Sequence, residues 1–133
     1  MSVTAPKMTS LPREFRRIRI ELAREPGHPA GSSRDGYEFI APLKPDGSID
    51  PTLWRAYRTA CGVIRFRAHE DDEIGHLVHK PGGTWAFHYD VTGEDDDEAG
   101  YRFQDERLLI GEYLSVREGD KLHTYRVVSV EHV

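Results

Sequence analysis

The sequence of 133 residues contains a single cysteine, Cys61, and no long hydrophobic run. One thiol cannot form an internal disulfide, which favours a reducing compartment, and we expect a cytoplasmic protein. No apolar stretch approaches the roughly 18–20 residues that a membrane-spanning helix needs. The first fifteen residues also lack the apolar segment of a signal peptide. We therefore expect neither a membrane protein nor a disulfide-stabilised secreted domain.

Catalytic and cofactor motifs are equally scarce. The sequence contains no phosphate-binding loop, no dinucleotide fingerprint and no nucleophile elbow. It also has no repeat at the period of a solenoid or propeller. Cys61 stands at the end of a predicted helix, where a buried thiol is far commoner than a nucleophile. We predict no cofactor and favour a protein that is not an enzyme.

Charge is abundant but unevenly distributed. Charged residues make up 31% of the chain, and the net charge is only −5. The first 24 residues carry a net charge of +4, and the remainder carries −9. The arginines of this segment are interpreted as the solvent-facing side of the first strand, which offsets the acidic body. RNA binding through this strand and an aromatic face is a third-ranked alternative, and nucleic acid is not a favoured partner.

Hydrophobic periodicity predicts short strands along most of the chain. Within 15–23, Ile18, Ile20 and Leu22 alternate with charged residues, which is typical of a half-buried strand. Residues 1–12 read as a disordered leader, and 13–133 as a single β-rich domain. Ile64, Phe66 and Ala68 alternate with arginines after Val63. Further strands are predicted at 37–43, 74–79, 84–90, 101–103, 108–117 and 122–130.

One helix is predicted, over 51–61. Asp50 is a suitable N-cap, Pro51 fits the first helical position, and Gly62 can provide a left-handed C-cap. Trp54 and Tyr57 lie three residues apart on its apolar stripe. The chain is therefore predicted to be mainly β: a strongly bent antiparallel sheet or small barrel of about seven or eight strands with one covering helix.

The aromatic residues around the turn at 80–83 suggest a ligand site. A four-residue hairpin loop would place Val78 opposite Trp85 and His76 opposite Phe87. Ile74, His76 and Val78 would then share a face with Trp85, Phe87 and Tyr89. A ligand bound in a barrel mouth or sheet concavity would contact five predicted residues: Trp54, Tyr57, His76, Trp85 and Phe87.

Two groups of residues could bind a metal ion. His79 and His88, with a carboxylate such as Asp90, would form a zinc or iron site if the hairpin brought them to one face. The acidic stretch that includes Asp95 and Asp97 partly follows the spacing of a calcium loop ending at Glu106. No helix precedes this stretch, so a solvated acidic loop is the preferred interpretation.

Several segments resemble known proteins. The run from Tyr37 through the helix, Asp71–Leu77, Asp95–Phe103 and Gly111–Val116 resemble a family of short bacterial proteins with no assigned activity. The last hairpin, from Gly111–Val116 to His123–Val130, is similar to that of PUA-like and ASCH-type barrels. The second resemblance implies a barrel fold and gives little indication of RNA binding.

The favoured function is a small cytoplasmic binding or regulatory module, monomeric or homodimeric, whose partner is a small molecule or a protein. The alternative is a metal-binding protein or a metal-dependent enzyme that uses the histidine and carboxylate residues.

Overall fold

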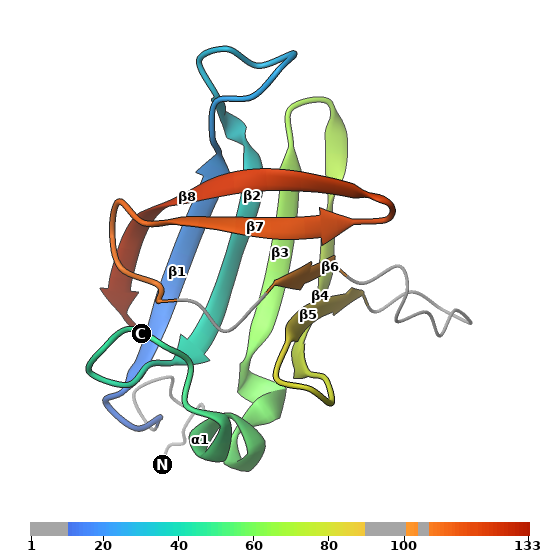
Figure 1. Ribbon diagram of the computed structural model, residues 1–133. Coiled ribbons are helices and arrows are strands. Elements are labelled where there is room, and N and C mark those ends of the chain that lie inside the picture. The colour runs from blue at the N-terminus through green and yellow to red at the C-terminus, as the bar shows by residue number, and fades with distance from the viewer. Residues whose placement is uncertain (1–10, 90–100, 104–106) are drawn as a thin grey trace, which may run out of the picture.

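A computed structural model describes residues 11–89, 101–103 and 107–133 (Figure 1). The strands, in chain order, are β1 (Phe15–Leu22), β2 (Ser32–Pro42), β3 (Gly62–Arg67), β4 (Glu70–His79), β5 (Trp85–Tyr89), β6 (Tyr101–Phe103), β7 (Tyr113–Glu118) and β8 (Lys121–His132). The helix α1 (Pro51–Ala56) and a 3-10 turn (Arg58–Ala60) connect β2 to β3. Most of the predicted leader lies outside the described residues.

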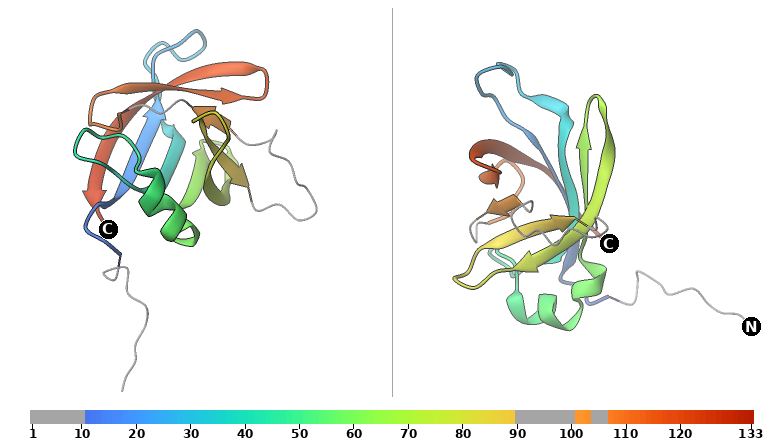
Figure 2. Two further views of the ribbon diagram at one scale, coloured as in Figure 1. Left: turned by 60° about the horizontal axis from the view of Figure 1, so that its bottom comes forward. Right: turned by 90° about the vertical axis from the view of Figure 1, so that its right-hand side faces the viewer.

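The strands form one strongly curled antiparallel sheet. Each strand pairs with the next along the chain, and β8 returns to pair with β1. Among the described residues, β6 and β7 are joined by one registered residue pair, Arg102 with Arg117. The two further views show how far the sheet bends around its interior (Figure 2). The prediction of a mainly β chain with a strongly bent antiparallel sheet is confirmed.

The core fills the concave side of this sheet. Strand β1 shows why: Ile18 and Ile20 are fully buried, whereas the adjacent Arg17 and Arg19 reach the outer surface. Successive side chains of a strand point to opposite faces, so the alternation in the sequence becomes an inside and an outside. Large aromatic residues supply much of the packed volume: Phe15, Tyr37, Phe39, Trp85 and Phe87.

The helix begins as predicted and ends earlier. The Asp50 carboxylate accepts hydrogen bonds from the backbone N–H groups of Thr52 and Leu53, at 3.0 and 3.1 Å. Helical geometry stops at Ala56, and Gly62 belongs to β3 instead of providing a left-handed cap. Within the described chain, no helix is both long and apolar enough to cross a membrane.

Helix α1 lies across one end of the curled sheet, at the bottom of Figure 1. Trp54 is its buried residue, and the Trp54 indole N–H donates to the carbonyl of Leu77 at 2.9 Å. The Trp54 ring also meets the Trp85 ring edge to face, with centroids 5.5 Å apart. The helix therefore covers less of the sheet than predicted: it is six residues long, with Trp54 buried and Leu53 partly buried against the core.

The register of the β4–β5 hairpin differs from the prediction by one residue. His79 pairs with Trp85 and Leu77 with Phe87, because the connecting loop holds five residues and is closed by a hydrogen bond from Lys80 N–H to Thr84 O. A one-residue shift exchanges the faces of a strand. Leu77 is consequently the inward neighbour of Phe87, and Ile74 is 63% exposed on the outside.

Candidate functional site

Charged side chains enter the interior at the end of the sheet opposite α1. Along β3 the inward positions are Val63 and then Arg65, and along β7 they are Val116 and then Glu118. Side chains alternate between the two faces of a strand, so Arg65 and Glu118 face the same interior as the buried valines that precede them. Arg65 is only 7% exposed, and the side chain of Glu118 is 10% exposed.

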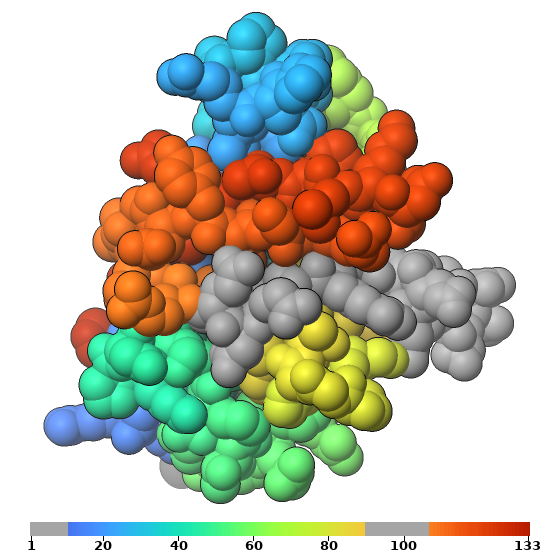
Figure 3. Space-filling model, in the orientation of Figure 1, coloured from blue at the N-terminus to red at the C-terminus, as the bar shows by residue number. Residues whose placement is uncertain are grey.

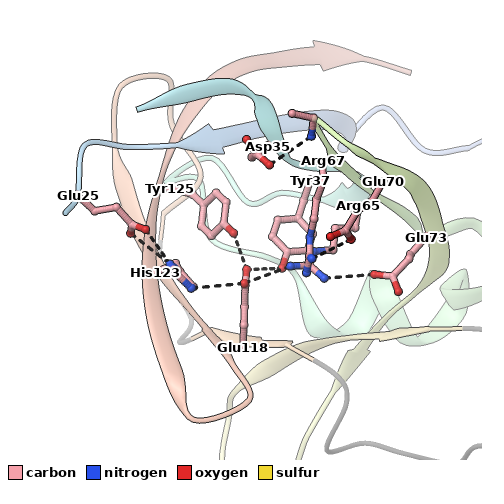
Figure 4. Close-up of polar contacts among 11 residues, drawn as sticks. Glu25, Asp35, Tyr37, Arg65, Arg67, Glu70, Glu73, Glu118, His123 and Tyr125 are labelled. Atoms are coloured by element: carbon pink, nitrogen blue, oxygen red, sulfur yellow. Dashed lines mark hydrogen bonds and ion pairs between the residues drawn. The ribbon is translucent and has the colours of Figure 1, made fainter. Parts of the chain in front are cut away.

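Glu118 is the centre of this polar cluster (Figure 4). Its Oε2 accepts hydrogen bonds from the hydroxyls of Tyr37, at 2.6 Å, and Tyr125, at 2.5 Å. Its Oε1 accepts a hydrogen bond from the Arg65 guanidinium at 3.3 Å. These partners come from β2, β8 and β3, so one carboxylate of β7 joins its own hairpin to two strands that are more than fifty residues away in sequence.

A second layer surrounds the buried carboxylate. The Arg65 guanidinium also contacts the Glu73 carboxylate, at 3.2 Å. The His123 ring lies between two carboxylates, with Nδ1 2.9 Å from Glu25 and Nε2 3.8 Å from Glu118. The cluster is therefore continuous from the buried Arg65 to the β1–β2 connection, which contains Glu25 (Figure 4).

Burial raises the pKa values of the two tyrosines that donate to Glu118, Tyr37 and Tyr125. Removal from water raises the pKa of Tyr37 well above its ordinary value, and the neighbouring Tyr125, Tyr89 and Glu118 add to the shift. Burial also raises the pKa of Tyr125, with further contributions from the charge and hydrogen bond of Glu118. Both hydroxyls therefore stay protonated in the physiological range and act as hydrogen-bond donors.

Several members of the cluster, among them Arg65, Glu118 and Tyr125, line a cleft of about 360 Å³. Glu25, Asp35 and Glu70 contribute carboxylates to its lining, and Arg67 pairs with Glu70 at 2.9 Å. Asp35 is held by the Ser32 hydroxyl at 2.6 Å and by the backbone N–H of Ala68 at 3.4 Å. The remaining lining residues are Leu22, His28, Gly36, Phe66 and His123.

The residues predicted to contact a ligand are not part of this cleft. Trp54, Trp85 and Phe87 are buried in the core, and His76 lies on the opposite face of its strand from Leu77. Tyr57 is partly exposed, with its ring edge against Phe15. Trp54 and Trp85 contact each other in the core, and none of the five side chains lines the cleft beside Glu118.

The predicted metal ligands are also separated. His88 pairs with His76, whereas His79 pairs with Trp85 and stacks on its ring at 4.0 Å, so His79 and His88 lie on opposite faces of the hairpin. Within the part of the chain that the structure describes, no group of three potential ligands could hold a metal ion. The other predicted ligands lie outside the described residues: Asp90, Asp95, Asp97 and Glu106.

The features that suggested RNA binding have other roles in the fold. Arg19 contacts Glu21 at 2.8 Å and Glu38 at 3.5 Å, and Arg17 lies 3.7 Å from Glu38. The basic side of β1 is therefore neutralised by its own strand and by β2. The row of Trp85, Phe87 and Tyr89 is buried, so it provides no open platform for stacking bases.

Sequence reasoning missed the polar cluster because its charged members occupy positions that look solvent-facing. The alternation of side chains along each strand gave a signal, because residues two positions apart face the same side of the sheet. Arg65 is two residues from the buried Val63, Glu118 is two from Val116, and His123 is two from Tyr125. A correct assignment of the inward face would have placed all three in the interior.

Compared with family models, curated proteins and solved structures, the chain matches none. The resemblances to short bacterial proteins and to PUA-like and ASCH-type barrels stay predictions.

Proposed function

We propose that the protein is a small-molecule-binding module whose ligand is a small organic cation, held in the cleft above Glu118. In this proposal the curled sheet acts as a small barrel, with α1 covering one end and the cleft at the other. The observation that carries the proposal is the nearly buried Glu118 carboxylate, which lines an accessible cleft and is held in place by three donors.

The free acceptor capacity of Glu118 supports this assignment. A carboxylate offers about four lone-pair sites, two on each oxygen. Two tyrosine hydroxyls occupy Oε2, whereas Oε1 accepts one hydrogen bond from Arg65 among the described residues. The His123 Nε2 is 3.8 Å away from Oε1, beyond hydrogen-bond length. An N–H of a bound cation would satisfy the remaining site.

The charge balance of the lining favours a cation. Arg65 is paired with Glu118, and Arg67 with Glu70. Glu25 contacts an imidazole, which is charged only when protonated, and Asp35 contacts a hydroxyl and a backbone N–H. The two carboxylates without a permanently charged partner leave the cleft electronegative.

A matched series of probes tests the proposal. Butylamine, butanol and butyrate share a carbon chain and differ in charge, and amide NMR shifts report where each binds. We expect butylamine to shift amides around the cleft and to bind more tightly than the other two. Asp35→Asn and Glu25→Gln should each weaken butylamine binding by about tenfold, because each removes a charge-assisted contact.

Glu112→Gln is the control, because Glu112 is an exposed carboxylate outside the cleft lining. It removes the same charge and should leave the affinity unchanged. Absence of any shift around the cleft with all three probes would contradict a binding function. Equal weakening by the control variant would show that net charge, and not the cleft, governs binding.

A further inference from the structure

A second cleft, of about 590 Å³, lies on the outer surface of the sheet. It is bounded by the end of β1, the start of β2 and the strands β7 and β8. In Figure 3 the segment that joins β1 to β2, coloured blue, lies directly above the orange and red strands. We call it the outer cleft, because the side chains of its β7 and β8 residues Tyr113 and Arg126 are exposed.

Irregular pairing accounts for the hollow. Between Glu21 and Leu22 the partner residue on β2 jumps from Gly36 to Ser32. On the other side, β8 has an extra residue where β1 passes from Arg19 to Ile20. Such bulges bend a strand locally and are over-represented next to binding sites. The outer cleft lies between these two irregularities.

Three arginines surround the outer cleft: Arg24, Arg34 and Arg126. All three are exposed, and none makes an ion pair within the described part of the chain. Glu21 also lines the cleft and is opposite Arg126 in register, but its carboxylate contacts Arg19 at 2.8 Å instead. The lining therefore has a surplus of positive charge, although the whole chain carries −5.

An aromatic ring completes the lining. Tyr113 is 59% exposed and pairs with Arg126 across β7 and β8, so both side chains are on the same face. An exposed aromatic ring beside unpaired guanidinium groups suits a ligand that has both a planar ring and an anionic group. Guanidinium groups bind phosphate oxygens through paired hydrogen bonds, and every base offers a flat face to a tyrosine.

We propose that the outer cleft binds a mononucleotide, with its phosphates on Arg24, Arg34 and Arg126 and its base on Tyr113. The volume is within the range of small-molecule sites, about 300–1,000 Å³. A free nucleotide fits better than a nucleic acid strand, because the acidic body of the protein repels a long polyanion. This proposal uses other residues than the cation cleft and is independent of it.

The first test compares two triple variants of equal charge. In one, Arg24, Arg34 and Arg126 are changed to glutamine; in the other, the exposed Lys44, Arg55 and Arg58 are changed instead. Calorimetry with ATP should show binding to the wild type and to the second variant. The first variant should lose at least about tenfold in affinity. Equal loss in both variants, or no binding of ATP to the wild type, would overturn the proposal.

The second test separates the base from the phosphates. Tyr113→Leu should weaken the binding of ATP several-fold and leave inorganic tripolyphosphate unaffected, whereas Tyr113→Phe should retain ATP binding. Equal affinity of the wild type for ATP and tripolyphosphate would refute the role of the ring. An eight-residue oligouridylate that binds more tightly than ATP would replace the free nucleotide with an RNA strand as the ligand.

Discussion

Removal of the Glu118 carboxylate is expected to destabilise the fold strongly. In Glu118→Ala, the hydroxyls of Tyr37 and Tyr125 and the guanidinium of Arg65 lose their shared acceptor. Breaking a buried ion pair by removing one partner costs about 3–5 kcal/mol. The value should lie toward the lower end of this range, because Arg65 keeps its contact with the half-exposed Glu73.

Urea unfolding followed by tryptophan fluorescence and circular dichroism measures this change. A loss of about 3–4 kcal/mol corresponds to a decrease of roughly 10–15 °C in the melting temperature of a domain of this size. Glu73→Ala is the control, because its side chain is 50% exposed and its ion pair should contribute less than about 1 kcal/mol. A loss below about 1 kcal/mol for Glu118→Ala would refute the reasoning.

The double variant Arg65→Met with Glu118→Leu separates the effect of Glu118 on stability from its effect on ligand binding. Replacement of a buried ion pair by apolar side chains of similar volume is often neutral or stabilising. We therefore expect the double variant to be more stable than Glu118→Ala and unable to bind butylamine. If it bound butylamine as well as the wild type, the Glu118 carboxylate would not be the anchor of the cation cleft.

Three further predictions follow from buried groups and close backbone contacts. Stability should fall above about pH 10, by about 1.4 kcal/mol per pH unit for each tyrosine whose folded pKa is raised, and the slope should be shallower in the double variant Tyr37→Phe with Tyr125→Phe. This sign follows because the folded hydroxyls retain protons that the unfolded chain releases; an unchanged slope would contradict it. Burial raises the pKa of Cys61 from 9.0 to about 12, so its thiolate fraction at pH 8 should be roughly a thousandfold lower than in the unfolded protein. Rapid labelling of the folded protein by a thiol reagent would show that Cys61 is accessible. Gly36→Ala should cost more than about 3 kcal/mol, because the new Cβ would lie 2.0 Å from a β1 carbonyl oxygen, whereas Gly62→Ala, with its nearest atom at 3.8 Å, should change stability by less than about 1 kcal/mol. Similar melting temperatures for the two variants would refute this contrast.

Local patterns were sufficient to predict much of the sheet. Strands β1 and β6 have almost the predicted bounds, and the Asp50 cap forms as expected. These features depend on residues close together in sequence: alternation within a strand, or a side chain that reaches the next turn. The register of the β4–β5 hairpin depends on one extra loop residue, and Gly82 and Gly83, both with φ near +95°, permit the longer loop. Composition does not distinguish the two loop lengths.

The candidate site could not be predicted for a different reason. Arg65 and Glu118 are 53 residues apart, and each looks like a solvent-facing residue within its own strand. Their burial is stable only because the opposite charge and two tyrosine hydroxyls arrive from other strands. The information that identifies this site is the pairing of whole strands, which no single segment contains.

The two clefts illustrate how little the net charge of −5 says about ligands. Arg17 and Arg19, the centre of the basic first strand, are neutralised by glutamates of β1 and β2. What remains is a positive surplus on the outer surface and a negative surplus in the interior, on opposite sides of the connection between β1 and β2. Leu22 lines both clefts, so they are neighbours. The two linings differ in the sign of their charge although the chain as a whole carries −5, so the net charge does not predict the charge of either cleft.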